Sequence, residues 1–338
     1  MIPRLFSRRY LSGLICSLSI VIALPGYAVA APPAFDIPIS CSLGTDCFIQ
    51  NYFDHGPGTG TGYSDYTCGM LSYSGHTGTD FRLRDLVAMQ NRVAVLASAA
   101  GTVVGARDGE ADVNVNIRGK SALRGKEAGN AVRIDHGDGW ETQYSHLLQG
   151  SIKVRVGQRV APGDVLGFVG FSGNTEFPHV DFTVRKNGKP LDPFSPGAAR
   201  CGSPDTLLWS NAARAALRYQ PTGLLISGFA TTEPTRDKAE NGAYVLSEIP
   251  ARADNILYWA EIFGLYKNDR MVIELYGPDR QRLLHHESIL PGNKAVWFEY
   301  TGKRRITKFW PAGTYAAHFK LERAGTAIID ELREIVVR

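Results

Sequence analysis

The 338-residue chain lacks features that would assign it to several large classes of protein. None of its five cysteines belongs to a Cys-x-x-Cys pair, which argues against zinc binding by cysteine. The formal net charge is only +4 and the charges are spread along the chain, so no basic footprint for nucleic acid is present. Internal repeats and low-complexity tracts are also missing. These absences favour a globular protein that does not bind nucleic acid.

Long apolar runs are missing except near the N-terminus. There, a basic segment with three arginines precedes the apolar stretch 11–24, and the small residues Ala28-Val29-Ala30 follow this stretch. The stretch is too short for a comfortable membrane span, so we interpret residues 1–30 as a secretory signal peptide, with an uncleaved anchor as the alternative. The mature chain would begin at Ala31, contain no membrane span, and act in the periplasm or outside the cell.

Four cysteines would remain after cleavage: Cys41, Cys47, Cys68 and Cys201. An even number in an exported protein suggests disulfides, and four cysteines allow three connectivities. We expect Cys41–Cys47 to close a short local loop. We expect Cys68–Cys201 to join the two ends of the region that carries the motifs described below.

Short alternating runs split by glycines dominate the chain after residue 62 and predict a mainly β protein. We expect an irregular, disulfide-stapled segment over 31–62, a β domain over 63–204, a linker helix within 205–222 and a β-sandwich over 223–338. The linker helix is expected at 207–217. The polar segment 108–129 is predicted to be a long surface loop that can contain a short helix. The expected strands are 92–97, 101–106, 131–136, 142–147, 179–185, 256–263, 271–276, 295–300 and 315–321.

Three short motifs place histidine and aspartate in the first β region. They are Gly75-His76-Thr77-Gly78-Thr79-Asp80, Tyr144-Ser145-His146-Leu147 and Pro178-His179-Val180-Asp181-Phe182. Residues i and i+2 of a strand project from one face, so His179 and Asp181 should point together. By the same rule we expect Thr142, Tyr144 and His146 to share a face. The glycines around His76 argue against a helix and favour a tight loop that wraps His76 and Asp80 round one ion.

This set of side chains has the composition of a catalytic metal site. Catalytic zinc is held by three protein ligands and a water, whose pKa the metal lowers to about 7. Histidines that do not bind the metal can transfer protons and hydrogen-bond an oxyanion. Taken singly, each residue could equally belong to an ordinary turn or core. The remaining histidines have no partner at ligand spacing and are interpreted as structural: His55, His136, His285, His286 and His318.

The ordered series of motifs resembles the lysostaphin-type (LytM-like) zinc metallopeptidases, which are peptidoglycan endopeptidases with the duplicated hybrid motif β-fold. The resemblance covers roughly residues 69–196 and does not extend to the C-terminal region. The stretches that carry it are 75–81, 95–104, 129–136, 142–147, 156–160, 167–174, 178–182 and 184–193.

The resemblance implies a role for each motif residue. His76 and Asp80 match the family's His-x-x-x-Asp zinc ligands. His146 and His179 match the two catalytic histidines, which orient or deprotonate the metal-bound water and stabilise the tetrahedral intermediate. The third ligand in the family is the second histidine of a His-x-His motif. This chain has Asp181 at that position.

Asp181 leaves three outcomes open. An aspartate oxygen binds zinc at about the distance of a histidine nitrogen, so His76, Asp80 and Asp181 can still form a metal site. Two carboxylates donate more charge to the ion and shift its preference toward Mn, Mg or Ca. The protein is therefore an active enzyme with an altered metal, a weak enzyme, or a metal-free binding module.

The sequence supports three functional hypotheses. The first is a secreted Zn²⁺-dependent or other divalent metal-dependent endopeptidase that cleaves peptidoglycan. The alternative is a catalytically degenerate envelope protein that binds cell wall or regulates other cell-wall hydrolases. The third is a carbohydrate-binding or protein-binding C-terminal sandwich, although aromatics at strand spacing more often belong to a core. The aromatics in question are Tyr258, Trp259, Trp297, Tyr300 and Trp310.

Overall fold

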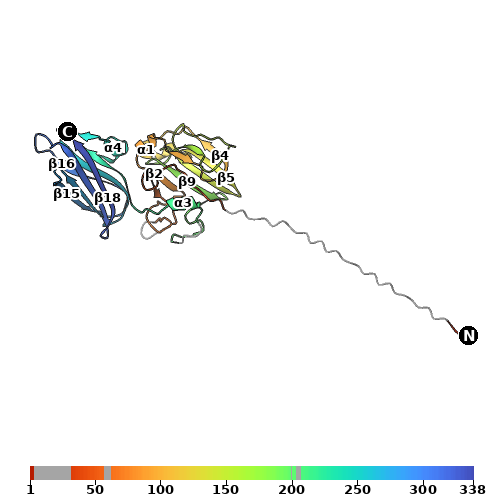
Figure 1. Ribbon diagram of the computed structural model, residues 1–338. Helices are drawn as coiled ribbons and strands as arrows, with labels where there is room; N and C mark the ends of the chain where they lie inside the picture. The colour runs from red at the N-terminus through yellow and green to blue at the C-terminus, as the bar shows by residue number, and fades with distance from the viewer. Residues whose placement is uncertain (4–31, 57–61, 199, 203–206) are drawn as a thin grey trace. The chain divides into compact units, whose positions relative to one another are not determined.

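The computed structural model describes residues 1–3, 32–56, 62–198, 200–202 and 207–338 (Figure 1). The expected signal peptide and its cleavage site lie almost entirely outside the described residues. None of the helices in the described part of the chain is long and apolar enough to cross a membrane. Residues 32–338 form one compact unit. The domain boundaries expected within this unit stay predictions.

The first part of this unit is built on an eight-stranded antiparallel sheet in the order β1-β2-β9-β6-β5-β4-β7, with β10 paired to β9. Its strands are β1 Cys47–Asn51, β2 Thr79–Leu83, β4 Gly101–Arg107, β5 Asn130–Gly137, β6 Trp140–Leu147, β7 Arg159–Val160, β9 His179–Lys186 and β10 Lys189–Leu191. A separate ladder joins β3 (Ala94–Leu96) to β8 (Val165–Phe168). The short helices are α1 (Leu86–Gln90), α2 (Val115–Arg118) and the 3-10 turn η1 (Lys120–Ala122). The last two lie in the segment expected to be a surface loop with a short helix.

One face of this sheet is apolar. Phe81 of β2, Val180 and Phe182 of β9, and Tyr144 of β6 are all fully buried in a common core. The alternate residues of β2 and β9 point to the other face, because side chains alternate along a strand. That second face carries the polar residues of the first and third motifs.

The C-terminal part is a β-sandwich, as expected. A three-stranded sheet has the order β11-β13-β16, and a five-stranded sheet has the order β12-β18-β17-β14-β15. The strands are β11 Gly223–Ala230, β12 Glu248–Ile249, β13 Asn255–Leu265, β14 Arg270–Tyr276, β15 Arg282–Ile289, β16 Lys294–Arg304, β17 Gly313–Arg323 and β18 Thr326–Val337, with helix α4 at Arg236–Glu240. All neighbours pair antiparallel except β12 and β18. Both sheets contribute to one apolar core.

Three of the five aromatic residues considered for a sugar-stacking face belong to apolar cores. Tyr258, Trp259 and Trp310 are buried. Trp297 is partly buried, while Tyr300 is exposed and donates a hydrogen bond to Glu233. The sandwich therefore does not present the five aromatics as one sugar-stacking face.

Both expected disulfides are present. Cys41 is joined to Cys47, and Cys68 is joined to Cys201 across a sequence separation of 133 residues. The second bond connects the segments that precede and follow all three motifs. The expected connectivity is thus confirmed.

Two expected elements differ from the structure. The segment 31–62 is not irregular throughout, because Cys47–Asn51 forms β1 and pairs with β2. The linker helix is shorter than expected and covers only Asn211–Ala216. It starts late because Trp209 forms a β-bridge with Phe35, which keeps the chain extended up to the cap at Ser210.

Candidate metal centre

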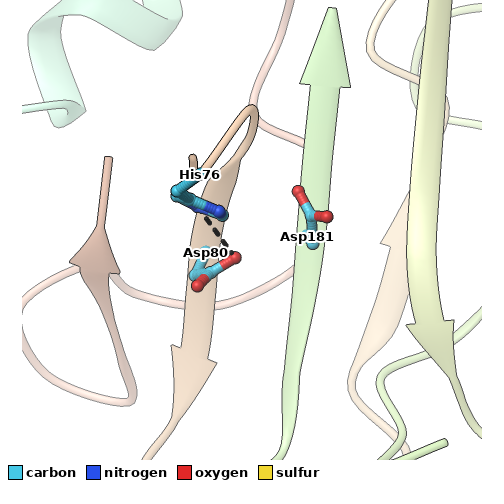
Figure 2. Close-up of side chains that lie close together, drawn as sticks. All are labelled: His76, Asp80 and Asp181. Atoms are coloured by element: carbon cyan, nitrogen blue, oxygen red, sulfur yellow. Dashed lines mark ion pairs between the residues drawn. The ribbon is translucent and has the colours of Figure 1, made fainter. Parts of the chain in front are cut away.

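The pairing of β2 with β9 brings the first and third motifs together. Asp80 lies directly opposite Asp181, and Arg82 lies directly opposite His179. Directly opposed residues share a face of the sheet, so all four side chains point to the polar side. Figure 2 shows Asp80 on β2 and Asp181 on β9, with His76 reaching toward them from the loop before β2.

Local contacts fix the loop that carries His76. Gly75 has a φ of 79°, a backbone conformation that glycine adopts without steric cost. Its N–H donates to a side-chain oxygen of Asp54 at 2.8 Å, and the carbonyl of His76 accepts from the N–H of Asp54 at 2.9 Å. The tight loop expected from the glycine spacing is therefore present.

The three candidate ligands converge on one point. His76, Asp80 and Asp181 each offer a ligand atom within 4.8 Å of the other two. Nε2 of His76 lies 3.3 Å from Oδ1 of Asp80. Both of these atoms are buried and lack a hydrogen-bond partner among the described residues. One imidazole and two carboxylates with unsatisfied buried atoms fit a divalent cation, which would compensate the cost of burying them.

Two further residues orient the carboxylates. Asn51 of β1 donates from Nδ2 to Oδ2 of Asp80 at 2.9 Å. Thr183 of β9 donates from Oγ1 to Oδ1 of Asp181 at 3.3 Å. Neither residue was predicted from the sequence. Thr183 could have been found by its i+2 spacing from Asp181, whereas Asn51 belongs to the segment that was expected to be irregular.

Gly78 allows the loop and β9 to approach each other. A Cβ atom at this position would lie 1.8 Å from Oδ1 of Asp181 and 2.9 Å from its Cγ. Any side chain at position 78 would therefore displace the carboxylate of Asp181. The second glycine of the first motif is needed here for close contact rather than for an unusual backbone angle.

The two carboxyl groups have opposite pKa shifts. Burial acts to raise the pKa of Asp80, but His76, His179 and the hydrogen bond from Asn51 outweigh it and hold that pKa well below its usual range. Burial raises the pKa of Asp181, and the negative charge of Asp80 raises it further. His76 has a raised pKa, since its attraction to Asp80 outweighs the effect of burial. The opposite shifts follow from the contacts: the histidines and Asn51 stabilise the charged form of Asp80, whereas the charge of Asp80 disfavours the charged form of Asp181.

The structure corrects the expected position of His146. Thr142 and Tyr144 do share a face, but it is the core face, where the Tyr144 hydroxyl accepts from the Ser98 N–H at 2.8 Å. The pairing of β5 with β6 is irregular between Tyr144 and Leu147, and His146 has a φ of 64°. This bulge turns His146 away from the core face and toward His179, with 4.6 Å between ring centroids.

Backbone carbonyls fix the orientation of both imidazoles. Nδ1 of His146 lies 2.7 Å from the carbonyl oxygen of Ser172, and Nδ1 of His179 lies 3.0 Å from that of Phe177. A carbonyl oxygen only accepts, so each Nδ1 carries the proton and each Nε2 has a free lone pair in the neutral ring. Nε2 of His179 lies 3.5 Å from Oδ1 of Asp80. Both histidines can therefore serve as bases beside the candidate metal centre.

Burial, together with the nearby His179, lowers the pKa of His146 to about 3. The ring of Tyr73 lies 4.4 Å from that of His76, and burial together with Asp80 and Asp181 raises the tyrosine pKa. The hydroxyl of Tyr73 thus stays protonated and can donate a hydrogen bond. A role for Tyr73 was not predicted from the sequence.

The other histidines have partners outside the candidate centre. His55 pairs with Asp192 at 2.7 Å, and His136 lies within hydrogen-bond distance of Ala100 and Thr142. The three in the sandwich pair with acidic side chains: His285 with Glu274, His286 with Glu299 and His318 with Asp330. Their interpretation as structural residues agrees with these contacts.

Comparison with known proteins identifies the region that contains the centre. The model of peptidase family M23 matches residues 74–193. The DD-carboxypeptidase/endopeptidase Mpg of Neisseria meningitidis is 34% identical over 115 residues, which is 33% of this chain and 25% of that protein. The peptidoglycan DD-endopeptidase ShyA of Vibrio cholerae is 32% identical over 117 residues, or 35% of this chain and 22% of that protein. The chain thus matches about a quarter of the length of these relatives.

Solved structures that align with part of the chain include a zinc-containing peptidase from Vibrio cholerae, with a TM-score of 0.33 and 24% identity over 48% of this chain and 39% of that one. The catalytic domain of lysostaphin from Staphylococcus simulans gives a TM-score of 0.26 and 22% identity over 42% of this chain and 85% of that one. His76, Asp80, His146, His179 and Asp181 all lie in the segment that the family model matches. The candidate metal centre therefore lies in a segment, residues 74–193, that is similar to peptidase family M23 and makes up about a third of the chain.

Proposed function

We propose that this chain is an exported, metal-dependent endopeptidase that hydrolyses peptide bonds of peptidoglycan. The observation that carries the proposal is the convergence of His76, Asp80 and Asp181 within 4.8 Å, beside two histidines whose Nδ1 atoms are held by carbonyls. The substrate class comes from the relatives, one of which is named a peptidoglycan DD-endopeptidase. Two disulfides in the structure support an oxidising compartment, as export would require.

The proposed ligands are His76, Asp80 and Asp181. A bound Zn²⁺ ion would supply an acidified water and polarise the scissile carbonyl. Asn51 and Thr183 hold the two carboxylates in place through their hydrogen bonds. Because two of the three ligands are carboxylates, Mn²⁺ is a second candidate ion.

The two imidazoles would assist proton transfer during peptide hydrolysis. His146 is neutral and accepts the proton of the attacking water at Nε2, while the water oxygen bonds to the carbonyl carbon. The same proton then passes to the amide nitrogen as the C–N bond breaks. His179 would accept a hydrogen bond from the attacking water at Nε2 and orient it toward the scissile carbonyl. Tyr73 can donate a hydrogen bond to the oxyanion.

The first experiment measures metal content and peptidoglycan cleavage of the chain from Ala31 onward. Wild type should hold one divalent ion and release peptides detectable by mass spectrometry, and Asp181→Ala should lose both properties. His318→Ala, which changes a histidine of the sandwich, is the matched control for His76→Ala and should retain both. If metal binds only after Asp181→His, Asp181 is not a ligand and the proposal fails.

A non-catalytic envelope protein that binds cell wall or regulates other cell-wall hydrolases is the second candidate. Asp181, in place of the expected histidine, is the observation that favours it. Under this candidate, His179→Ala would leave the cellular role intact. Loss of that role in His179→Ala, with normal folding, would support the enzyme instead.

A further inference from the structure

Arg82 is a buried cation next to the candidate metal centre. It follows Asp80 by two residues on the same face of β2, lies opposite His179 in the register and is 0% exposed. Burying a guanidinium is costly unless its donors are satisfied. The hydrogen-bond partners of Arg82 therefore show how its buried charge is compensated.

The partners of Arg82 come largely from the C-terminal part of the chain. Nη2 donates to Oε1 of Glu240 at 3.1 Å and to Oε1 of Glu261 at 3.4 Å, while Nη1 donates to Gln50 at 2.5 Å. Glu240 belongs to α4 and Glu261 to β13 of the sandwich. Arg236 donates to the same two Oε1 atoms at 3.1 and 2.9 Å. Two arginines and two glutamates thus form a closed network that joins the sandwich to β2.

Arg82 is also connected to His179, through contacts with Phe177. Its guanidinium carbon lies 4.7 Å from the centroid of the Phe177 ring, a cation–π distance. The Phe177 ring lies 4.7 Å from the His179 ring, and its backbone carbonyl accepts the Nδ1 proton of His179 at 3.0 Å. Contacts are therefore continuous from Glu261 through Arg82 and Phe177 to His179.

We propose that the sandwich acts as part of the active site, because Glu240 and Glu261 hold Arg82 and Phe177 in the arrangement that orients His179. This inference rests on the function proposed above. The segment that the family model matches ends at residue 193, so the two glutamates lie outside it. Stability alone does not account for the network, since a buried ion-pair cluster is often no more stabilising than apolar residues of similar volume.

The position of Phe177 makes it the best site for a test. It is only partly buried, so its substitution should preserve the fold. Phe177→Leu removes the aromatic face while keeping an apolar side chain, and Phe177→Tyr keeps that face. Glu261→Gln weakens the network from the sandwich side. Asp269→Asn is the matched control, because Asp269 forms a buried pair with Arg323 of the same sandwich, at 2.8 and 2.7 Å, without reaching β2.

The experiment measures kcat and KM on peptidoglycan fragments, metal content, and the ¹⁵N resonances of the histidine rings. Phe177→Leu should lower kcat by about 10- to 100-fold, as expected for a misplaced catalytic group, with KM and metal content unchanged. Phe177→Tyr should restore most of the loss, and Glu261→Gln should shift the same His179 ring signals. Asp269→Asn should change neither kcat nor these signals.

Two results would overturn the inference. One is wild-type kcat together with unshifted His179 signals in both Phe177→Leu and Glu261→Gln. The other is an equal loss of kcat in Asp269→Asn, which would mean that the sandwich acts only through general stability. If wild type does not cleave peptidoglycan at all, the proposed function fails, whereas the His179 signals still decide whether the contacts orient the ring.

Discussion

At the scale of single residues, Gly78 decides whether Asp181 can stay in the candidate metal centre. A Cβ at position 78 would lie 1.8 Å from Oδ1 of Asp181. We therefore expect Gly78→Ala to weaken metal binding by at least about tenfold, as disturbing the supports of a ligand does. Titration of the metal-free protein measures this. Gly292→Ala is the control, because a Cβ there meets nothing within 4 Å, and an equal loss in the control would contradict the role of Gly78.

Asn51 gives a second prediction at this scale. It is the hydrogen-bond donor to Oδ2 of Asp80, at 2.9 Å. Asn51→Ala should reduce metal affinity by about 10- to 100-fold while leaving the His76 and Asp181 ligands in place. Asn241→Ala removes an amide that bonds only a backbone carbonyl of α4 and serves as the control. Unchanged affinity in Asn51→Ala would mean that Asp80 needs no second support.

At the scale of elements, the sequence predicted the parts of the site that follow the regular strand period. His179 and Asp181 share a face of β9 because β9 is a regular strand, and i+2 spacing is then sufficient. The prediction that His146 shares a face with Thr142 and Tyr144 was wrong, because the bulge in β6 changes the face to which this residue points. The alternation of apolar and polar residues in the sequence does not reveal such a bulge. Arg82 and Glu261 are 179 positions apart in the sequence, and the residues around either of them do not predict their contact.

The network between β2 and β13 also gives a prediction about pH. Burial raises the pKa of Glu261 to about 7, although Arg82 and Arg236 act to lower it. The folded protein therefore keeps a proton on Glu261 between pH 4.5 and about 7, where the unfolded chain has lost it. This contribution to the free energy of unfolding is fully present below pH 4.5 and disappears as pH rises through the folded pKa.

Glu261→Gln should remove that pH dependence. Relative to the variant, wild type should lose roughly 3 kcal/mol of unfolding free energy between pH 4.5 and 7, at about 1.36 kcal/mol for each unit of pKa shift. Urea unfolding of both proteins across this range measures the difference. Parallel stability curves for the two proteins would show that Glu261 titrates at its ordinary pKa.

At the scale of the whole molecule, the two disulfides should contribute very unequally to stability. The sequence separation is 133 for Cys68–Cys201 and 6 for Cys41–Cys47. In the chain-entropy treatment, cross-linking stabilises by restricting the unfolded chain, by about 5 kcal/mol for the long loop and about 2 kcal/mol for the short one. Replacing both cysteines of one pair by serine and measuring urea unfolding tests this.

The long bond encloses all of the motif residues and both β2 and β9, so its loss should lower the stability of the site itself. Cys68→Ser with Cys201→Ser should therefore lose metal at a lower urea concentration than Cys41→Ser with Cys47→Ser. Wild type in a reducing buffer should lose metal at a urea concentration no higher than the first variant does, because reduction opens both bonds. If reduction leaves both unfolding and metal retention unchanged, the bond does not stabilise the site, and the argument that this fold depends on an oxidising compartment loses its support.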